Sequence, residues 1–179
     1  MTQVGSVYGE ALYELAKSEG LQESILEELK ALNESFRQEP GFIQLLSSHA
    51  ISKQERCKVL DDSFRGKINQ YVLNFLKILT EKGYMHHFSH CCEAYTRLYN
   101  EDNNILSVRA VTAVSLTGTQ SQALTQKLTR LTGKTILLEN RVDPTCLGGV
   151  RLDYDGQRLD DTISHRLDSV RELLKNTVL

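Results

Sequence analysis

Apolar residues recur at helical spacing through the first hundred residues of the chain. In the first segment they stand three or four positions apart and define one stripe: Val4, Val7, Tyr8, Ala11, Leu12 and Leu15. A repeat of this kind predicts an amphipathic α-helix, and Gly20 is placed to end it. A second helix is predicted from a second stripe: Leu21, Ile25, Leu29, Leu32 and Phe36.

The same pattern predicts two further elements before residue 67. Pro40 is expected to stop the second helix, and residues 42–46 are expected to form a short apolar turn. Ser52 with Glu55 forms a capping box. The helix that this box opens is predicted to end at Gly66.

The next predicted helix, over residues 68–79, is apolar around roughly two-thirds of its circumference. Such a helix either lies at the centre of its bundle or contacts a partner outside it. Gly83 is placed to end it, and a sixth helix is predicted over residues 88–99. The polar tetrapeptide at 101–104 is the predicted domain boundary.

After residue 104 the pattern changes to that of a mixed domain. Residues 105–116 are β-branched and partly alternating, which predicts a strand. Thr117 and Gln120 form a second capping box, which opens a helix that should end at Gly133. A second strand is predicted over residues 135–142.

The chain is predicted to close with a hairpin and a helix. Asp155-Gly156 is a strong two-residue hairpin signal between strands at 149–154 and 157–160. A last helix, with Asp160 or Asp161 as its N-cap, is predicted from the stripe Ile163, Leu167, Val170 and Leu174. The expected fold class is therefore α+β: a six-helix bundle over residues 1–104, followed by a small α/β domain over 105–179.

Composition and charge exclude several classes of protein. The formal net charge of −2 argues against a nucleic-acid binder. No apolar run approaches the roughly 18 residues that span a bilayer, so no direct membrane insertion is expected. The four cysteines contain no CxxC pair and are expected to be free thiols. The first 105 residues carry 11 basic and 15 acidic residues, whereas the remainder carries 10 and 8.

One local cluster offers metal or thiol chemistry. If residues 86–92 are helical, His86 and His90 share a face, as do His87 and Cys91, and Cys92 follows. Two histidines and a cysteine could hold zinc. A helix start with solvated histidines and inward-facing cysteines accounts for the same residues, and neither metal nor cofactor is expected.

Other candidate chemistry is weak. Gly148-Gly149 lacks the frame of a phosphate loop and precedes a strand, so a bend before that strand is expected. The carboxylates of Asp160 and Asp161 are expected at a helix start, where they favour the positive end of the dipole. No hydrolase or metalloprotease motif is present in the sequence.

Three segments carry a resemblance to a known family. They are Val7–Ala16 (VYGEALYELA), Asn74–Gly83 (NFLKILTEKG) and Asp143–Leu167, which includes LGGVRL, Asp160 and Arg166-Leu167. With the order of the elements, they resemble the delta subunits of bacterial F-type ATP synthases, relatives of the mitochondrial oligomycin-sensitivity-conferring protein. The resemblance covers the whole chain. Gly9 departs from a common alanine, Asp161-Thr162 from a common Gly-Ser, and His165 from a small residue.

The resemblance implies a non-catalytic stator subunit of a rotary proton-translocating ATP synthase, at the cytoplasmic face of the cell membrane. The helical domain would bind the N-terminal helix of an alpha subunit. The C-terminal domain would bind the C-terminal ends of the b subunits, and other synthase subunits would lie nearby. Neither nucleic acid nor a cofactor is implied.

The positions of the family's contacts follow from the resemblance. A groove between the first and fifth helices would receive the alpha-subunit helix, in a helix-in-groove mode. Its contacts would be Tyr8, Ala11, Leu12, Leu15, Asn74, Phe75, Ile78 and Leu79. Leu15, Phe75 and Leu79 could equally belong to the core. The stalk-binding region would include Gly148, Gly149, Asp160, Arg166 and Leu167.

Two other functions compete with this interpretation. A small zinc or thiol enzyme would use His86, His90 and Cys91. A generic helical adaptor would regulate a different assembly.

Overall fold

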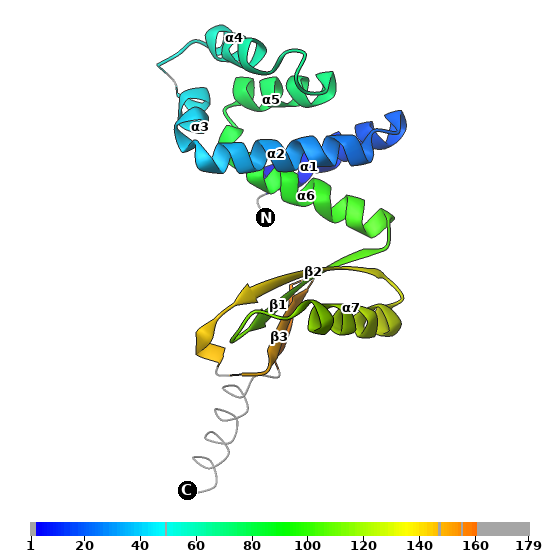
Figure 1. Cartoon of the computed structure of the whole chain (residues 1–179). Helices are drawn as coiled ribbons and strands as arrows, with labels where there is room; N and C mark the ends of the chain where they lie inside the picture. The colour runs from blue at the N-terminus through cyan, green and yellow to red at the C-terminus, as the bar shows by residue number, and fades with distance from the viewer. Residues whose placement is uncertain (1–2, 49, 147, 155, 161–179) are drawn as a thin grey trace, which may run out of the picture. The chain divides into compact units, whose positions relative to one another are not determined.

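The computed structural model describes residues 3–48, 50–146, 148–154 and 156–160. The predicted last helix lies outside these residues, as do Asp161, Arg166 and Leu167. The chain divides into two compact units, with the second beginning at Asn100 (Figure 1). The described part is helix-rich and mixed, with seven α-helices and one four-stranded sheet, and it confirms the α+β class.

Six α-helices precede the sheet. They are α1 (Gln3–Glu19), α2 (Gln22–Gln38), α3 (Pro40–Ser47), α4 (Lys53–Phe64), α5 (Gln70–Lys82) and α6 (Phe88–Asp102), with a 3-10 turn η1 (Met85–His87) before α6. The prediction of a mere turn at residues 42–46 is wrong, because those residues lie within α3. Pro40 is in the first turn of α3, where a missing N–H costs nothing.

The predicted helix signals of this unit are present as side-chain contacts. Ser52 Oγ accepts from the Glu55 amide at 3.2 Å, while the Glu55 carboxylate accepts from the Ser52 amide at 3.1 Å. Asn69 was predicted to lie within the next helix and is instead its N-cap: Asn69 Oδ1 accepts from the Tyr71 amide at 2.9 Å, and α5 begins at Gln70. Gly83 ends α5 in the left-handed region, with φ 75°.

Helix α1 turns a different face to the core from the one its apolar stripe predicts. The buried residues of α1 are Gly5, Gly9, Leu12, Tyr13 and Ala16. Of the predicted stripe only Leu12 is buried, and Val7 and Leu15 are 58% and 40% exposed. The reason is the close approach of α6, because a Cβ on Gly9 would lie 2.5 Å from the Cys91 carbonyl oxygen.

A buried arginine joins three helices of this unit. Arg56, on α4, is 6% exposed. Its Nη1 donates to the Leu46 carbonyl of α3 at 2.7 Å and to the Thr80 carbonyl of α5 at 3.4 Å. Both carbonyls lie in the last turn of their helices, where the helix dipoles favour a positive charge. Arg56 therefore ties the carboxyl ends of α3 and α5 to α4.

The second unit is a sheet with one covering helix. Its elements are β1 (Ile105–Thr112), α7 (Gly118–Thr132), β2 (Thr135–Val142), η2 (Pro144–Cys146), β3 (Val150–Tyr154) and β4 (Gln157–Asp160), and the strand order is β2-β1-β3-β4. β1 and β2 are parallel, joined through α7, and the other pairs are antiparallel. The pairing of Tyr154 with Gln157 confirms the predicted hairpin.

The first strand is shorter than predicted. β1 ends at Thr112, so residues 113–116 were wrongly included. Asn140 of β2 explains the difference: its Nδ2 donates to the Ala110 carbonyl at 3.0 Å and to Thr112 Oγ1 at 2.9 Å, and its Oδ1 accepts from the Leu116 amide at 2.9 Å. These bonds turn the chain away from the sheet and lead it to the capping box at Thr117.

The two faces of the sheet differ in character. One face is apolar and packs on Leu116, Leu124 and Leu128, from α7 and the residues that lead into it. On the other face, one lateral row crosses all four strands with alternating charge: Glu139, Arg109, Asp153 and Arg158. Glu139 pairs with Arg109 at 3.2 Å and Asp153 with Arg158 at 3.0 Å.

Candidate partner-binding site

The predicted groove residues of α1 and α5 fall into two groups. Leu12, Phe75 and Leu79 are buried in the hydrophobic core of their unit. Tyr8 is half-buried and packs at the edge of that core. The remaining four are exposed: Ala11, Leu15, Asn74 and Ile78. The buried side chains hold the two helices in place, and only the exposed ones are free to contact a partner.

A tyrosine pair brings the two helices together at one end. The rings of Tyr8 and Tyr84 meet edge to face, with centroids 5.9 Å apart. Tyr8 lies in the first half of α1, and Tyr84 follows the carboxyl end of α5. The start of α1 is therefore beside the end of α5.

Exposed apolar side chains lie on both helices. Ile78 of α5 is 45% exposed, although four of its neighbours along the helix are fully buried. Val7 and Leu15 are exposed on α1. Val7 was predicted to lie on one apolar stripe with Leu12. The small residues Gly5, Gly9 and Ala16 were the signal that a different face of α1 packs inward.

The predicted stalk-binding positions can be located only in part. Gly149 has φ 85°, a conformation that favours glycine, and Val150 begins β3 directly after it. Gly148 also has a positive φ. Asp160 is the last residue of β4 and lies opposite Arg151.

The histidine and cysteine cluster does not have the geometry that one continuous helix would give. His86 and His87 belong to η1, and α6 begins only at Phe88. The interpretation of His86 and His90 as neighbours on one helical face is therefore wrong. Among the described residues, no group of three or more histidine, cysteine or acidic side chains could hold a metal ion.

The two adjacent thiols of this cluster are buried. Desolvation raises the pKa of the Cys91 thiol to about 11. Burial, followed by the charges of Cys91 and Glu93, raises the pKa of Cys92 still further. A cysteine nucleophile needs its thiolate near neutral pH, and both environments oppose ionisation. His87 has a lowered pKa, chiefly from desolvation and then from His86 and His90.

The chain is similar to one family over almost its whole length. The family model described as ATP synthase delta (OSCP) subunit matches residues 4–174. The ATP synthase subunit delta of Alkaliphilus oremlandii (strain OhILAs) is 32% identical, over 98% of this chain and 98% of its own. The chain belongs to the ATP synthase delta (OSCP) subunit family.

Two further comparisons cover nearly the whole chain. The ATP synthase subunit delta of Enterococcus faecalis (strain ATCC 700802 / V583) is 30% identical, over 96% of this chain and 95% of its own. A chain in the cryo-EM structure of the Toxoplasma gondii mitochondrial ATP synthase hexamer covers 97% of this chain, with a TM-score of 0.79. Its identity is 20% over 98% of that chain, so this likeness concerns the fold alone.

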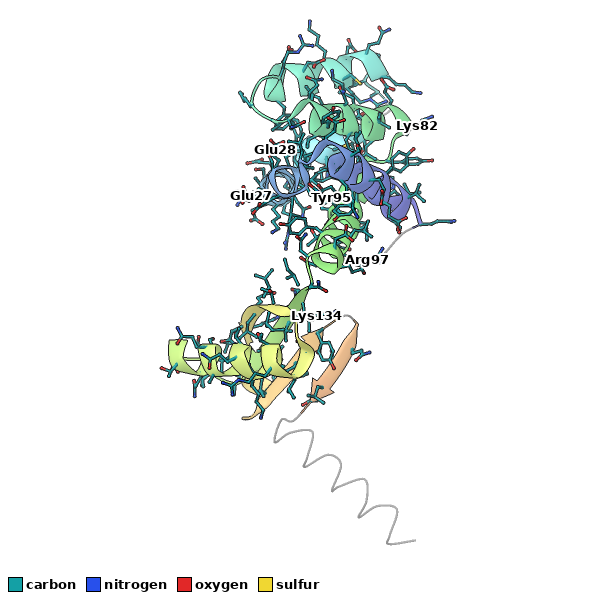
Figure 2. All side chains as sticks on the ribbon, turned by 90° about the vertical axis from the view of Figure 1, so that its right-hand side faces the viewer. Glu27, Glu28, Lys82, Tyr95, Arg97 and Lys134 are labelled. Atoms are coloured by element: carbon teal, nitrogen blue, oxygen red, sulfur yellow. The ribbon has the colours of Figure 1, made fainter. Side chains whose placement is uncertain are left out.

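A second surface feature of this family member was missed by the sequence analysis. A cleft of about 550 Å³ runs between α4 and α5. Three lysines line it, namely Lys53, Lys58 and Lys82, and Figure 2 shows Lys82 at the end of α5. Lys53 and Lys58 lie on α4, whereas Lys82 lies on α5. Only the packing of α4 on α5 brings the three lysines to one cleft.

No described helix of this family member is both long enough and apolar enough to cross a membrane.

Proposed function

We propose that the chain is the non-catalytic stator subunit of a proton-translocating F-type ATP synthase, placed at the cytoplasmic face of the cell membrane. The first unit binds the N-terminal helix of an alpha subunit. The second unit binds the C-terminal ends of the b subunits. The chain thereby links the catalytic head to the peripheral stalk. Membership of the delta (OSCP) family and the names of its relatives support this role.

The division of the α1 stripe is the observation that most favours the alpha-subunit site. A helix whose small residues face the core leaves Val7 and Leu15 outside. The carboxyl end of α5, which meets α1 through the contact of Tyr84 with Tyr8, exposes Ile78. Exposed large apolar residues that gather on one surface mark interaction sites. A helix-in-groove partner would cover them with residues at i, i+3, i+4 and i+7.

We propose that the chain is not catalytic because its candidate cysteines and histidines are poorly placed for chemistry. Cys91 and Cys92 are buried, with raised pKa values. The histidines of the same cluster belong to two separate elements: His86 and His87 to η1, and His90 to α6. We expect purified protein to hydrolyse no ATP and to bind no stoichiometric zinc; a zinc equivalent lost in His90→Ala would favour the enzyme alternative.

The alpha-subunit site is tested by Ile78→Asp. Because Ile78 is 45% exposed, the substitution leaves the fold intact, but a partner would have to desolvate the new carboxylate. We expect binding of a synthetic alpha-subunit N-terminal peptide to weaken by at least about tenfold, roughly 1.4 kcal/mol, in calorimetric titration.

The matched control is Leu131→Asp, an equal change in charge on α7 at a residue that is 73% exposed. It should bind the peptide as the natural sequence does. Normal binding by a folded Ile78→Asp variant would show that the alpha helix does not lie on this surface.

A further inference from the structure

The lysine cleft between α4 and α5 has an unbalanced charge. The ammonium groups of Lys53, Lys58 and Lys82 form no ion pair or hydrogen bond with any residue that the structure describes. Two acidic residues, Asp61 and Glu81, also line the cleft. These carboxylates neutralise the lysines only if they are not paired elsewhere.

Asp61 is engaged elsewhere. Its Oδ1 accepts from Lys77 at 2.7 Å and from Arg65 at 3.1 Å. The hydrogen bond from Lys77 is the largest influence on its pKa, which is lowered despite partial desolvation. Asp61 is therefore paired with two cations outside the set of three lysines.

Glu81 leaves most of the positive charge uncompensated. Within the described residues its carboxylate has one contact, the Cys57 thiol at 3.8 Å. Even if it offsets one lysine, two remain. This excess stands in a unit that is acidic as a whole, since the first 105 residues carry 11 basic and 15 acidic residues. A cleft concentrates such a local potential better than a convex surface does.

The cleft adjoins the surface proposed for the alpha-subunit helix. Lys82 and Ile78 are four residues apart on α5 and so project from one face of that helix. On the other flank of α5, α4 contributes Lys53 and Lys58. A helix lying on Ile78 would thus be within one helical turn of Lys82, which lines the cleft.

We infer that this cleft binds acidic side chains of the partner helix, so that the alpha-subunit segment is held by apolar contacts on α1 and α5 and by carboxylates on the lysines of α4 and α5. The inference rests on the proposed function and adds the charge of the ligand. Contacts between exposed charges contribute modestly to affinity and more to the rate and selectivity of association.

The test replaces the three lysines together. Lys53→Gln/Lys58→Gln/Lys82→Gln keeps good helix formers in place. The matched control, Lys30→Gln/Lys127→Gln/Lys134→Gln, removes the same charge from exposed or half-buried positions outside the cleft. Full-length proteins are titrated with the alpha-subunit N-terminal peptide at low and high salt. A second peptide has its Asp and Glu replaced by Asn and Gln.

The cleft variant should bind the natural peptide about tenfold more weakly at low salt and lose most of the salt dependence, whereas the control stays within about twofold. The neutral peptide should bind both variants equally. Equal weakening in the two variants would show a net-charge effect without a site and overturn the inference. So would unchanged binding by the cleft variant.

A separate probe distinguishes failure of the cleft from failure of the proposed function. The full chain is titrated with hexaglutamate by amide NMR, and the expected shifts are confined to Lys53, Gln54, Cys57 and Lys82 and vanish in the cleft variant. If the natural chain does not bind the alpha peptide, the proposed function fails. Chemical-shift changes with hexaglutamate would then still show that the cleft binds acidic side chains. The absence of such changes would overturn the inference about the cleft as well.

Discussion

At position 9 the chain has no room for a side chain. A Cβ there would lie 2.5 Å from the Cys91 carbonyl oxygen and 2.8 Å from the Ala94 Cβ, so α1 or α6 would have to move. The family resemblance places a common alanine at this position. The glycine therefore belongs to a closer contact between α1 and α6 than an alanine would allow.

We expect Gly9→Ala to destabilise the first unit by about 1–3 kcal/mol, the usual cost of overpacking. The measurement is the midpoint of urea denaturation, followed by circular dichroism. Gly41→Ala is the control, because its added Cβ meets nothing within 4 Å. Equal midpoints for the two variants would mean that α1 and α6 can move apart to admit the methyl group without a loss of stability.

The buried thiol of Cys91 should make stability depend on alkaline pH. Its pKa is about 11 in the folded chain, against an ordinary value of 9.0. Below pH 9 both states hold the proton, so this thiol adds no pH dependence to the stability. Between pH 9 and 11 only the unfolded thiol ionises, so the free energy of unfolding falls as pH rises, by up to about 1.4 kcal/mol per unit.

Urea denaturation at a series of pH values from about 8 to 11 measures this slope. The Cys91→Ala variant should show a shallower fall over the same range. Parallel curves for the variant and the natural chain would show that the thiol titrates alike in both states.

On the scale of the elements, local signals predicted more than packing did. The capping boxes at Ser52 and Thr117 and the glycine after α5 satisfy backbone groups within a few residues, so the sequence alone locates them. The face that α1 buries depends on the contour of α6, a contact some 80 residues away. The periodicity of apolar residues therefore predicted the helix correctly and predicted the wrong buried face.

The end of β1 shows the same limit. Residues 113–116 have strand-like side chains, yet the chain leaves the sheet because Asn140, 28 residues beyond Thr112, donates to the Thr112 hydroxyl and accepts from the Leu116 amide. For the candidate site, the sequence likewise predicted the two helices but not which of their residues are exposed. The resemblance gave α1 and α5, but only packing separates the buried Phe75 from the exposed Ile78. The lysine cleft has no local signal at all.

Asn140→Ala should destabilise the second unit by about 1–3 kcal/mol, because the Leu116 amide and the Ala110 carbonyl lose a partner. Amide hydrogen exchange at Leu116 should become faster. Gln126→Ala, an exposed change on α7, is the control and should leave this exchange rate unaltered. Unchanged protection at Leu116 in Asn140→Ala would remove the asparagine as the cause of the strand end.

On the scale of the whole molecule, the proposed function assigns one partner to each unit. Removal of residues 162–179 should abolish binding to the b subunits. Affinity for the alpha-subunit peptide should stay within about tenfold, roughly 1.4 kcal/mol, because both proposed groove helices lie before Asn100. Pull-down with b and titration with the peptide measure the two effects. Loss of alpha binding with stalk binding kept would mean that the partners are assigned to the wrong ends.

The place of β1 in the sheet has a mechanical consequence. The chain passes from the first unit into the second through β1, and β1 is hydrogen-bonded to β2 on one side and to β3 on the other. A pull along the axis of β1 would load both ladders at once and in shear, so many bonds would have to break together. A pull that began at β4, an outer strand, could open its single ladder bond by bond. Tension between the two units thus arrives at the strand best anchored to bear it.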